Sequence, residues 1–181
     1  MSTILVVYYS NTGSNKYVAE RIAHDLECDI ERIRPRLPAF PMILMSSFLK
    51  ISAGIKPLQH NLADYEKVIL CGPVAAGQFL APLRDFVKKY RQRINKLYFA
   101  TNCGSSDKHK DGKFGYGKIF TALEQELGDK LVFARAFPIA LVIPQDKQDD
   151  ADYVMKTRLS DENFKGEIAE RLDGFVAKVK L

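Results

Sequence analysis

The amino-acid sequence contains no tryptophan and only three cysteines, Cys28, Cys71 and Cys103. The cysteines have no CxxC spacing and no neighbouring pair of histidines, which argues against a zinc site and against a disulfide framework. The three histidines are equally scattered, so no metal site and no catalytic triad is expected. Reduced thiols are typical of a cytoplasmic protein.

No targeting signal is expected either. Residues 1–9 have neither the basic start nor the small-residue cleavage site of a signal peptide. The most apolar stretch, residues 40–55, is too short to span a bilayer, which takes roughly 20 residues. We therefore expect no transmembrane segment. The stretch itself is either the helix between the second and third strands or a surface for a partner subunit, a quinone or a membrane edge.

The composition is that of an ordinary globular domain, with 46% apolar and 27% charged residues. Its 181 residues predict one domain, residues 1–181. The formal net charge of +5 favours acidic partners or anionic ligands.

Short apolar runs alternate with segments of helical period along the whole chain. This alternation predicts an α/β fold, a parallel sheet covered on both faces by helices. The predicted strands are residues 4–9, 29–33, 67–71, 97–101 and 131–137. Four amphipathic helices are predicted around Val18–Leu26, Leu83–Val87, Ile119–Leu127 and Phe164–Val176.

A polar loop follows the first predicted strand and precedes the first predicted helix. Its residues are Ser10, Asn11, Thr12, Gly13, Ser14 and Asn15. A phosphate bound there would meet helix N-terminal amides and several hydroxyl and amide side chains. The loop has neither the glycines of a dinucleotide fingerprint nor the lysine of a P-loop, and its lack of Lys and Arg suits a monophosphate. The alternative is an ordinary polar turn with a capping serine.

The loop resembles the phosphate loop of the flavodoxin family, Ser/Thr-x-Thr-Gly-x-Thr, with Asn15 in the last position, where it can still donate and cap. The resemblance continues in residues 72–77, Gly-Pro-Val-Ala-Ala-Gly, which are similar to the family segment Gly-x-Pro-Val-Trp-x-Gly. It also covers residues 97–104 and, in all, about residues 4–127.

The resemblance implies a flavodoxin-like three-layer sandwich with a five-stranded parallel sheet of order 2-1-3-4-5. It implies FMN at the carboxyl ends of the strands. The cofactor-binding residues would be Ser10, Asn11, Thr12, Gly13, Ser14, Asn15, Pro73, Val74, Ala75, Ala76, Gly77, Thr101, Asn102, Cys103 and Gly104. No side chain is expected to act in catalysis, because the flavin carries the chemistry. The Gly77 peptide lies where it could hydrogen-bond to the flavin.

Ala75 departs from the family, because many relatives have a tryptophan against the flavin ring at that position. One face of the ring is therefore expected to be open to a substrate, unless Phe79, Phe114 or Tyr116 covers it. Cys71 and Cys103 end neighbouring predicted strands, where they are either small buried side chains or a redox pair.

The chain is also basic where family electron carriers are acidic. Residues 84–118 contain ten basic and three acidic side chains, and Lys108, Lys110 and Lys113 lie in a long glycine-rich loop. These lysines are either scattered solvated charges or a surface that attracts an acidic redox partner or a nicotinamide phosphate.

The resemblance implies an FMN-binding redox protein in one of two forms. It is either an electron carrier for an acidic redox protein or an oxidoreductase that reduces a small quinone-like acceptor, with NAD(P)H as a possible electron donor. The alternative is a non-catalytic flavodoxin-fold module that binds a phosphate ligand or a partner protein. Nucleic-acid binding is not expected, because no stacking platform or recognition helix accompanies the basic residues. Assembly into a homodimer is an alternative that the sequence does not decide.

Overall fold

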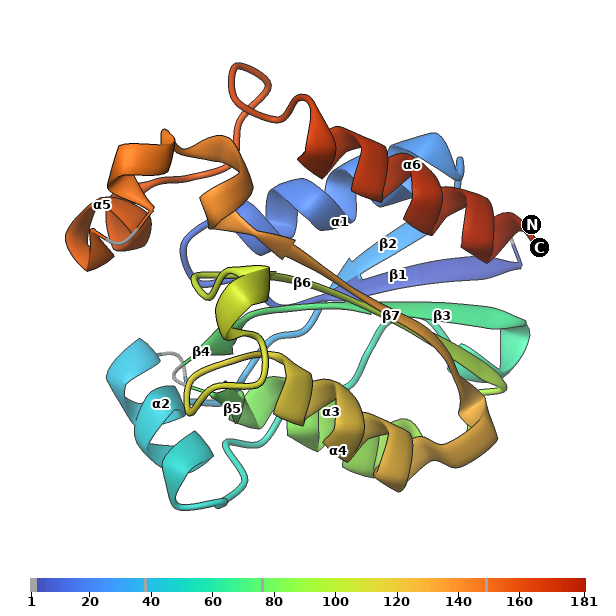
Figure 1. Cartoon of the computed structure of the whole chain (residues 1–181). Helices are drawn as coiled ribbons and strands as arrows, with labels where there is room; N and C mark the ends of the chain where they lie inside the picture. The colour runs from blue at the N-terminus through green and yellow to red at the C-terminus, as the bar shows by residue number, and fades with distance from the viewer. Residues whose placement is uncertain (1–2, 38, 76, 149) are drawn as a thin grey trace.

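The computed structural model describes residues 3–37, 39–75, 77–148 and 150–181. Its centre is a sheet whose five long parallel strands lie in the order β2-β1-β3-β6-β7 (Figure 1). These strands are β1 (Ile4–Tyr8), β2 (Asp29–Arg32), β3 (Lys67–Cys71), β6 (Lys96–Cys103) and β7 (Leu131–Pro138). In chain order this is 2-1-3-4-5, so the predicted fold class and strand order are confirmed.

The sheet also has two strands that the sequence did not predict. The strands β4 (Val74–Ala75) and β5 (Gln78–Phe79) form an antiparallel hairpin, and β4 joins the carboxyl end of β6, where Val74 pairs with Cys103. The expected sheet of five parallel strands is therefore a mixed sheet of seven strands. Strands of two residues are too short to show an alternating pattern in the sequence.

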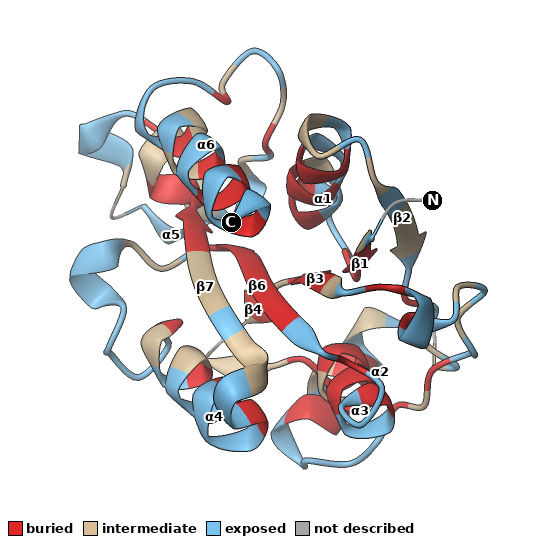
Figure 2. Cartoon of the chain, turned by 90° about the vertical axis from the view of Figure 1, so that its right-hand side faces the viewer, coloured by how far each residue is buried: buried red, intermediate tan, exposed pale blue. Residues whose placement is uncertain are grey.

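Helices cover both faces of the sheet, as the alternation of strands and helices predicts. The helices α1 (Ser14–Asp25) and α6 (Glu167–Lys180) lie on one face, while α3 (Ala81–Tyr90) and α4 (Gly117–Leu127) lie on the other (Figures 1 and 2). Each helix buries an apolar stripe against the sheet, and the buried residues form one core cluster on each face. This arrangement gives the three layers of the predicted sandwich.

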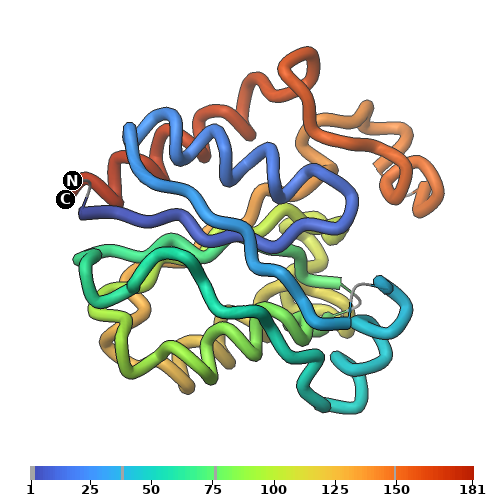
Figure 3. The backbone as a smooth tube through the Cα atoms, turned by 180° about the vertical axis from the view of Figure 1, so that it is seen from behind, coloured from blue at the N-terminus to red at the C-terminus, as the bar shows by residue number. Residues whose placement is uncertain are grey.

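The apolar stretch 40–55 forms a helix only in its first part. The helix α2 (Phe40–Phe48) packs against α3 and β5, and residues 49–55 continue as a turn and an extended segment that ends in a bridge between Ile55 and Pro35. The expected helix between the second and third long strands is therefore present but shorter. In Figure 3, the view from behind, the segments that enter and leave α2 lie in the foreground, where Pro35 and Ile55 form their bridge.

A second short helix, α5 (Ala151–Lys156), lies at the same end of the sheet as α2 (Figure 1). Short 3-10 helices complete the chain at Leu62–Asp64, Asp107–His109, Gly128–Lys130, Ile139–Val142 and Gln145–Lys147. In the part of the chain that the structure describes, no helix has the length and apolar character needed to cross a bilayer.

Candidate functional site

The carboxyl ends of the parallel strands converge on one cavity of about 150 Å³. Ligands of open α/β sheets bind at this edge. Ten of the fifteen expected cofactor-binding residues line the cavity: Asn11, Thr12, Ser14, Asn15, Pro73, Val74, Ala75, Asn102, Cys103 and Gly104. The structure therefore brings together three segments that are far apart in the sequence.

The first wall of the cavity is the turn between β1 and α1. Gly13 caps the helix with a φ of 104°, which favours glycine, and no side chain caps the first amides of α1. The amide groups of the first helical turn have no intrahelical acceptor and point out of the helix end. Asn11 and Thr12 are exposed, and their side chains make no hydrogen bond to any described residue. Amides, a hydroxyl and a carboxamide are thus free to donate to an anion.

The two serines of this turn are already engaged. Ser10 Oγ accepts a hydrogen bond from the amide of Gly13 at 3.1 Å, and Ser10 lines a neighbouring cavity instead. Ser14 Oγ accepts from the amide of Leu159 at 3.2 Å and is almost fully buried. Because its own proton is not used in that bond, the Ser14 hydroxyl can still donate into the cavity.

Asn15 has a structural task beside the one expected of it. Its Oδ1 accepts from the amide of Asn102 at 2.8 Å, and its Nδ2 donates to the carbonyl of Asn102 at 3.0 Å. Both side chains are buried. The Asn15 carboxamide therefore joins the turn to the end of β6, and only the second hydrogen of its Nδ2 is left to donate into the cavity that it lines.

The second wall is the hairpin that follows β3. Pro73, Val74 and Ala75 line the cavity. Gly77 lies in the turn of the hairpin with a φ of 68°, and a Cβ there would stand 2.5 Å from the carbonyl oxygen of Lys113. Gly77 therefore touches the long loop after β6 instead of lining the cavity. Ala76, which was also expected to bind the cofactor, lies outside the described residues.

The third wall is the end of β6. Asn102, Cys103 and Gly104 line the cavity, whereas Thr101 is fully buried in the sheet and does not reach it. Burial raises the pKa of the Cys103 thiol to about 12, so this group stays protonated at neutral pH. Cys71 packs in the core cluster of the opposite face of the sheet, so the two thiols do not form a redox pair.

Six further residues line the cavity that sequence reasoning did not identify. They are Phe40 from α2, Ile139 directly after β7, Val154 and Met155 from α5, and Thr157 and Arg158 just after α5. Arg158 adds a positive charge to a cavity whose loop has none, and it comes from a segment far from the loop in sequence. The sequence contained one signal for α5, an aspartate at the position before the helix. In the structure, Asp150 caps α5 by accepting hydrogen bonds from the amides of Asp152 and Tyr153.

The aromatic residues considered as covers for a ligand ring lie elsewhere. Phe79 turns into the core and packs edge-on against Phe99, at 5.7 Å between ring centroids. Tyr116 is buried and donates its hydroxyl proton to Asp107, while Phe114 is exposed. None of the three lines the cavity, and Phe40 is the aromatic side chain that does.

The long loop after β6 is fixed at its base. The Asp107 carboxylate accepts a hydrogen bond from the Tyr116 hydroxyl and forms an ion pair with Arg171 of α6. The Arg171 guanidinium beside it holds the pKa of the Asp107 carboxyl below its usual value. The lysines at positions 108, 110 and 113 are exposed and form no ion pair with any described residue.

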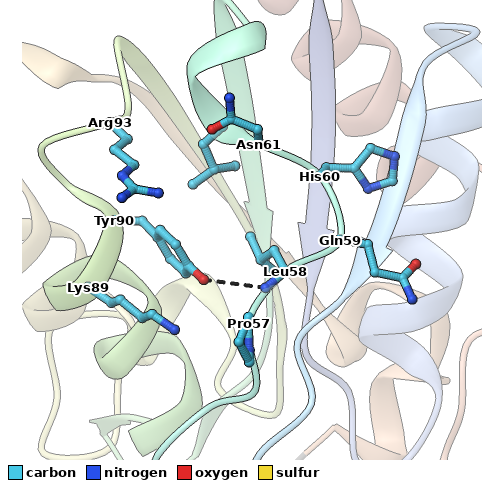
Figure 4. Close-up of a pocket in the computed structure, with 9 residues that line it drawn as sticks. Pro57, Leu58, Gln59, His60, Asn61, Lys89, Tyr90 and Arg93 are labelled. Carbon is cyan, nitrogen blue, oxygen red and sulfur yellow. Dashed lines mark hydrogen bonds between the residues drawn. The ribbon is translucent and has the colours of Figure 1, made fainter.

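A wider cavity of about 320 Å³ lies away from this edge, between α3 and the segment that precedes β3 (Figure 4). Its polar groups are largely satisfied. The Tyr90 hydroxyl accepts from the amide of Leu58 at 3.3 Å, and Glu31 accepts from the amides of Gln59 and His60. The carboxyl-edge cavity, with free donors on its wall, is the better candidate for a ligand site.

Comparison with known proteins agrees with the architecture. A family model described as a flavodoxin domain matches residues 49–145, which is just over half of the chain. No match was found among curated proteins.

Among solved structures, a protein of Bacteroides eggerthii DSM 20697 classed as a flavoprotein matches with a TM-score of 0.63 and 21% identity, over 75% of this chain and 88% of that one. A flavoprotein of Lactobacillus acidophilus NCFM in complex with FMN gives a TM-score of 0.55 and 13% identity, over 75% and 93%. A flavodoxin of Streptococcus pneumonia TIGR4 gives 0.51 and 12%, over 98% and 97%. These likenesses establish the shared fold.

Proposed function

The chain belongs to the flavodoxin-domain family, and from that premise we propose that it binds FMN in the carboxyl-edge cavity and acts as an oxidoreductase toward a small quinone-like acceptor. The observation that carries the proposal is the convergence of a free helix N-terminus with Ala75 and the end of β6 on one cavity. The FMN complex of the Lactobacillus acidophilus flavoprotein, which has the same fold, supports the choice of cofactor.

In this proposal the turn after β1 holds the phosphate. The first amides of α1, the Thr12 hydroxyl and the Asn11 carboxamide donate hydrogen bonds to its oxygens. Gly13 allows the turn, because glycine adopts the positive φ of this position at low cost, whereas most other residues would be strained there. Arg158, which lines the same cavity, adds a positive charge that favours the bound dianion.

The flavin ring would lie between the hairpin and the end of β6. Ala75 offers only a small side chain at this place, and Phe40 and Met155 add apolar side chains to the lining of the cavity. When bound, FMN supplies the capacity to accept and release electrons, and the protein supplies placement and environment. A small flat acceptor with little charge suits apolar walls better than a charged one, which favours a quinone.

The proposal is tested first by cofactor binding. Thr12→Ala removes a hydroxyl that makes no hydrogen bond within the described structure, so the fold should be unaffected. We expect FMN to bind more weakly by about 1.5 to 3 kcal/mol, roughly 10- to 100-fold, because that is the value of a hydrogen bond to a charged group. Riboflavin, which has no phosphate, should bind equally well to both proteins. Thr121→Ala, on the exposed face of α4, is the matched control.

Quenching of flavin fluorescence measures both affinities. If Thr12→Ala binds FMN as tightly as the wild type, the phosphate lies elsewhere. If the wild type binds neither FMN nor riboflavin, the chain is a non-catalytic module that keeps the fold for another ligand or partner.

A second candidate is an electron carrier for an acidic redox protein. The exposed lysines at positions 108, 110 and 113 favour it, because they form no ion pair with any described residue and the loop that carries them contacts the hairpin where Gly77 meets Lys113. Their joint replacement by glutamate should slow exchange with an acidic partner at low salt and leave FMN affinity unchanged. If the glutamate variant exchanges electrons with the acidic partner as fast as the wild type and still reduces quinones, the result would favour the oxidoreductase.

A further inference from the structure

The helix α2 exposes apolar side chains on its outer side. Its inner side buries Ile43 together with Ser46 and Ser47, and Phe40 and Leu44 pack partly against the core. The other large apolar side chains of α2 and of the turn after it face outward, with exposed fractions between 42% and 61%: Met42, Met45, Phe48, Leu49 and Ile51. We call these five residues the α2 platform. Surface helices normally present polar side chains on the outer side, so an exposed apolar cluster of this size is typical of an interaction surface.

The platform is held in place by polar contacts on its inner side. Ser47 Oγ donates to the carbonyl of Ile43 at 2.6 Å and accepts from the amide of Ala81 at 2.8 Å, where α3 begins. Arg84 donates to the carbonyl of Ile51 at 2.6 Å. The exposed side chains therefore project from a fixed backbone and do not result from a frayed helix end.

The next residue of α3 fixes the segment that leaves the platform. Asp85 Oδ2 accepts from the amides of Ala53 and Gly54, both at 2.9 Å, and from Ser52 Oγ at 3.0 Å. Its Oδ2 atom thus accepts three hydrogen bonds from uncharged donors, and the side chain is buried. The carboxylate keeps its negative charge, but in the cavity that it lines it is outnumbered by Arg36, Lys88 and Lys89.

The surroundings of the platform are basic. From residue 33 to residue 63 the sequence contains no Asp or Glu. Arg34, Arg36, Lys50 and Lys56 lie within this stretch of sequence, are exposed and form no ion pair with any described residue. Lys88 of α3 lines one cavity with Arg36 and with Ser52, which directly follows the platform residue Ile51. An apolar patch flanked by unpaired cations is complementary to a surface that combines hydrocarbon with negative charge.

We propose that the α2 platform docks this protein on the surface of an anionic phospholipid bilayer. A second copy fits less well, since a symmetric interface would bring each basic rim against that of the other copy. A protein partner also fits less well, because the platform has no tyrosine, tryptophan or arginine of the kind that anchors protein interfaces. Figure 1 shows α2 at the periphery, where a flat membrane can reach it.

The docking surface is continuous with the candidate site. Phe40, the first residue of α2, lines the carboxyl-edge cavity, and the platform continues from the same helix. Docking would therefore bring the mouth of the cavity to the lipid boundary, where apolar acceptors dissolve. The inference goes beyond the proposed function and does not depend on it, because lipid binding requires no electron transfer.

Flotation of the purified full chain with lipid vesicles tests the proposal. We expect binding to vesicles of phosphatidylcholine with phosphatidylglycerol, and binding at least about tenfold weaker to phosphatidylcholine alone. Met45→Ser combined with Phe48→Ser should weaken binding to the anionic vesicles by about tenfold or more. The matched control is Val132→Ser combined with Leu181→Ser, two exposed apolar residues outside the platform, which should bind as the wild type does.

A charge variant separates the two contributions. Lys50→Glu combined with Lys88→Glu keeps the apolar platform but should remove the preference for anionic vesicles. Urea midpoints of all variants verify that the fold is retained. Absence of vesicle binding by the wild type, or equal binding by the platform variant, would overturn the proposal. A concentration-dependent dimer that only the platform variant abolishes would assign the surface to a second copy instead. Since the vesicles contain no quinone, a failed electron-transfer assay has no effect on this test.

Discussion

The side chain of Asn15 and the peptide of Asn102 exchange two hydrogen bonds, although the two residues are 87 positions apart in the sequence. The pair joins the turn after β1 to the end of β6, across the strand β3 that separates them. It fixes two walls of the candidate site relative to each other. Binding sites need such support, because ligands are held by groups whose positions do not change on binding.

Asn15→Ala should therefore destabilise the fold. The substitution leaves the buried amide of Asn102 without its partner and leaves its carbonyl only the long hydrogen bond from Thr101 Oγ1, at 3.5 Å. Each unsatisfied buried group costs about 1 to 3 kcal/mol. We expect a loss of about 2 to 4 kcal/mol in the free energy of unfolding, measured by urea denaturation. Asn95→Ala, at an exposed position with no hydrogen-bond partner among the described residues, should change it by less than about 0.5 kcal/mol. Similar small losses in both variants would mean that water replaces the Asn15 carboxamide.

This pair also illustrates how far the sequence could predict the site. The turn 10–15 and the end of β6 were identified as neighbours, because parallel strands bring their carboxyl ends to one edge. The specific role of Asn15 was not, because a carboxamide in a turn looks the same whether it faces a ligand or a distant peptide. Phe40 and Arg158 were not predicted as cavity residues for a related reason. They reach the cavity from segments whose local sequence patterns do not indicate where those segments pack.

The places of the strands in the sequence were predicted better than the residues at which the strands begin and end. The strand β3 has the expected bounds, Lys67–Cys71, whereas β6 runs from Lys96 to Cys103 and exceeds the predicted 97–101. Asn102 and Cys103 have a low intrinsic preference for strands, but they pair with Phe137 and Pro138 of β7, and Cys103 also pairs with β4. Tertiary pairing thus extends the strand beyond what local propensity indicates.

Phe40 provides a test of where the flavin ring lies. Phe40→Ala removes the aromatic side chain that lines the cavity and should weaken binding of FMN and riboflavin equally, by about 0.5 to 1.5 kcal/mol. Thr12→Ala, in contrast, affects only FMN. Phe114→Ala, at an exposed aromatic residue outside the cavity, serves as the control and should leave both affinities unchanged. A loss confined to FMN would place Phe40 near the phosphate instead of the ring.

Ala75 separates the two forms of the proposed redox function. Ala75→Trp should fill the open side of the cavity, tighten FMN binding by about 0.5 to 1.5 kcal/mol through stacking, and suppress quinone reduction. Exchange with a protein partner should change little, because it uses the exposed rim of the cofactor. Both rates are measured in wild type and variant under the same conditions. Equal small effects on the two rates would contradict the proposal that the acceptor enters beside Ala75.

Gly77 tests the contact between the hairpin and the long loop. Gly77→Ala places a Cβ at 2.5 Å from the carbonyl oxygen of Lys113, in addition to the strain of a φ of 68°. Gly128 is the control, because its φ of 54° is also positive but a Cβ there meets nothing within 4 Å. We expect Gly128→Ala to cost about 1 to 3 kcal/mol of unfolding free energy, which is the cost of a sparsely populated backbone conformation alone. Gly77→Ala should cost clearly more, and equal losses would show that the loop simply moves away.

The Asp107–Arg171 ion pair predicts how stability depends on pH. Because Arg171 lowers the pKa of the Asp107 carboxyl in the folded chain, the carboxylate stabilises the fold above its unfolded pKa, and that contribution is lost as the pH falls through the folded pKa. Asp107→Asn should therefore lower the urea midpoint at pH 7, and the difference from the wild type should shrink below about pH 4.

Asp152→Asn is the control for this effect, since Asp152 pairs with Lys156 in an exposed position where ion pairs contribute little. It should leave the midpoint unchanged at both pH values. Asp107 also accepts the Tyr116 hydroxyl, so Tyr116→Phe distinguishes the two partners. It removes the hydrogen bond but leaves the ion pair. Because this hydrogen bond also lowers the pKa of the Asp107 carboxyl, the effect of Tyr116→Phe should shrink at acidic pH as well, but it should be smaller than that of Asp107→Asn, since Arg171 is the larger cause. A pH-independent loss in Asp107→Asn would mean that the side chain acts through the packing of the loop, and not through its charge.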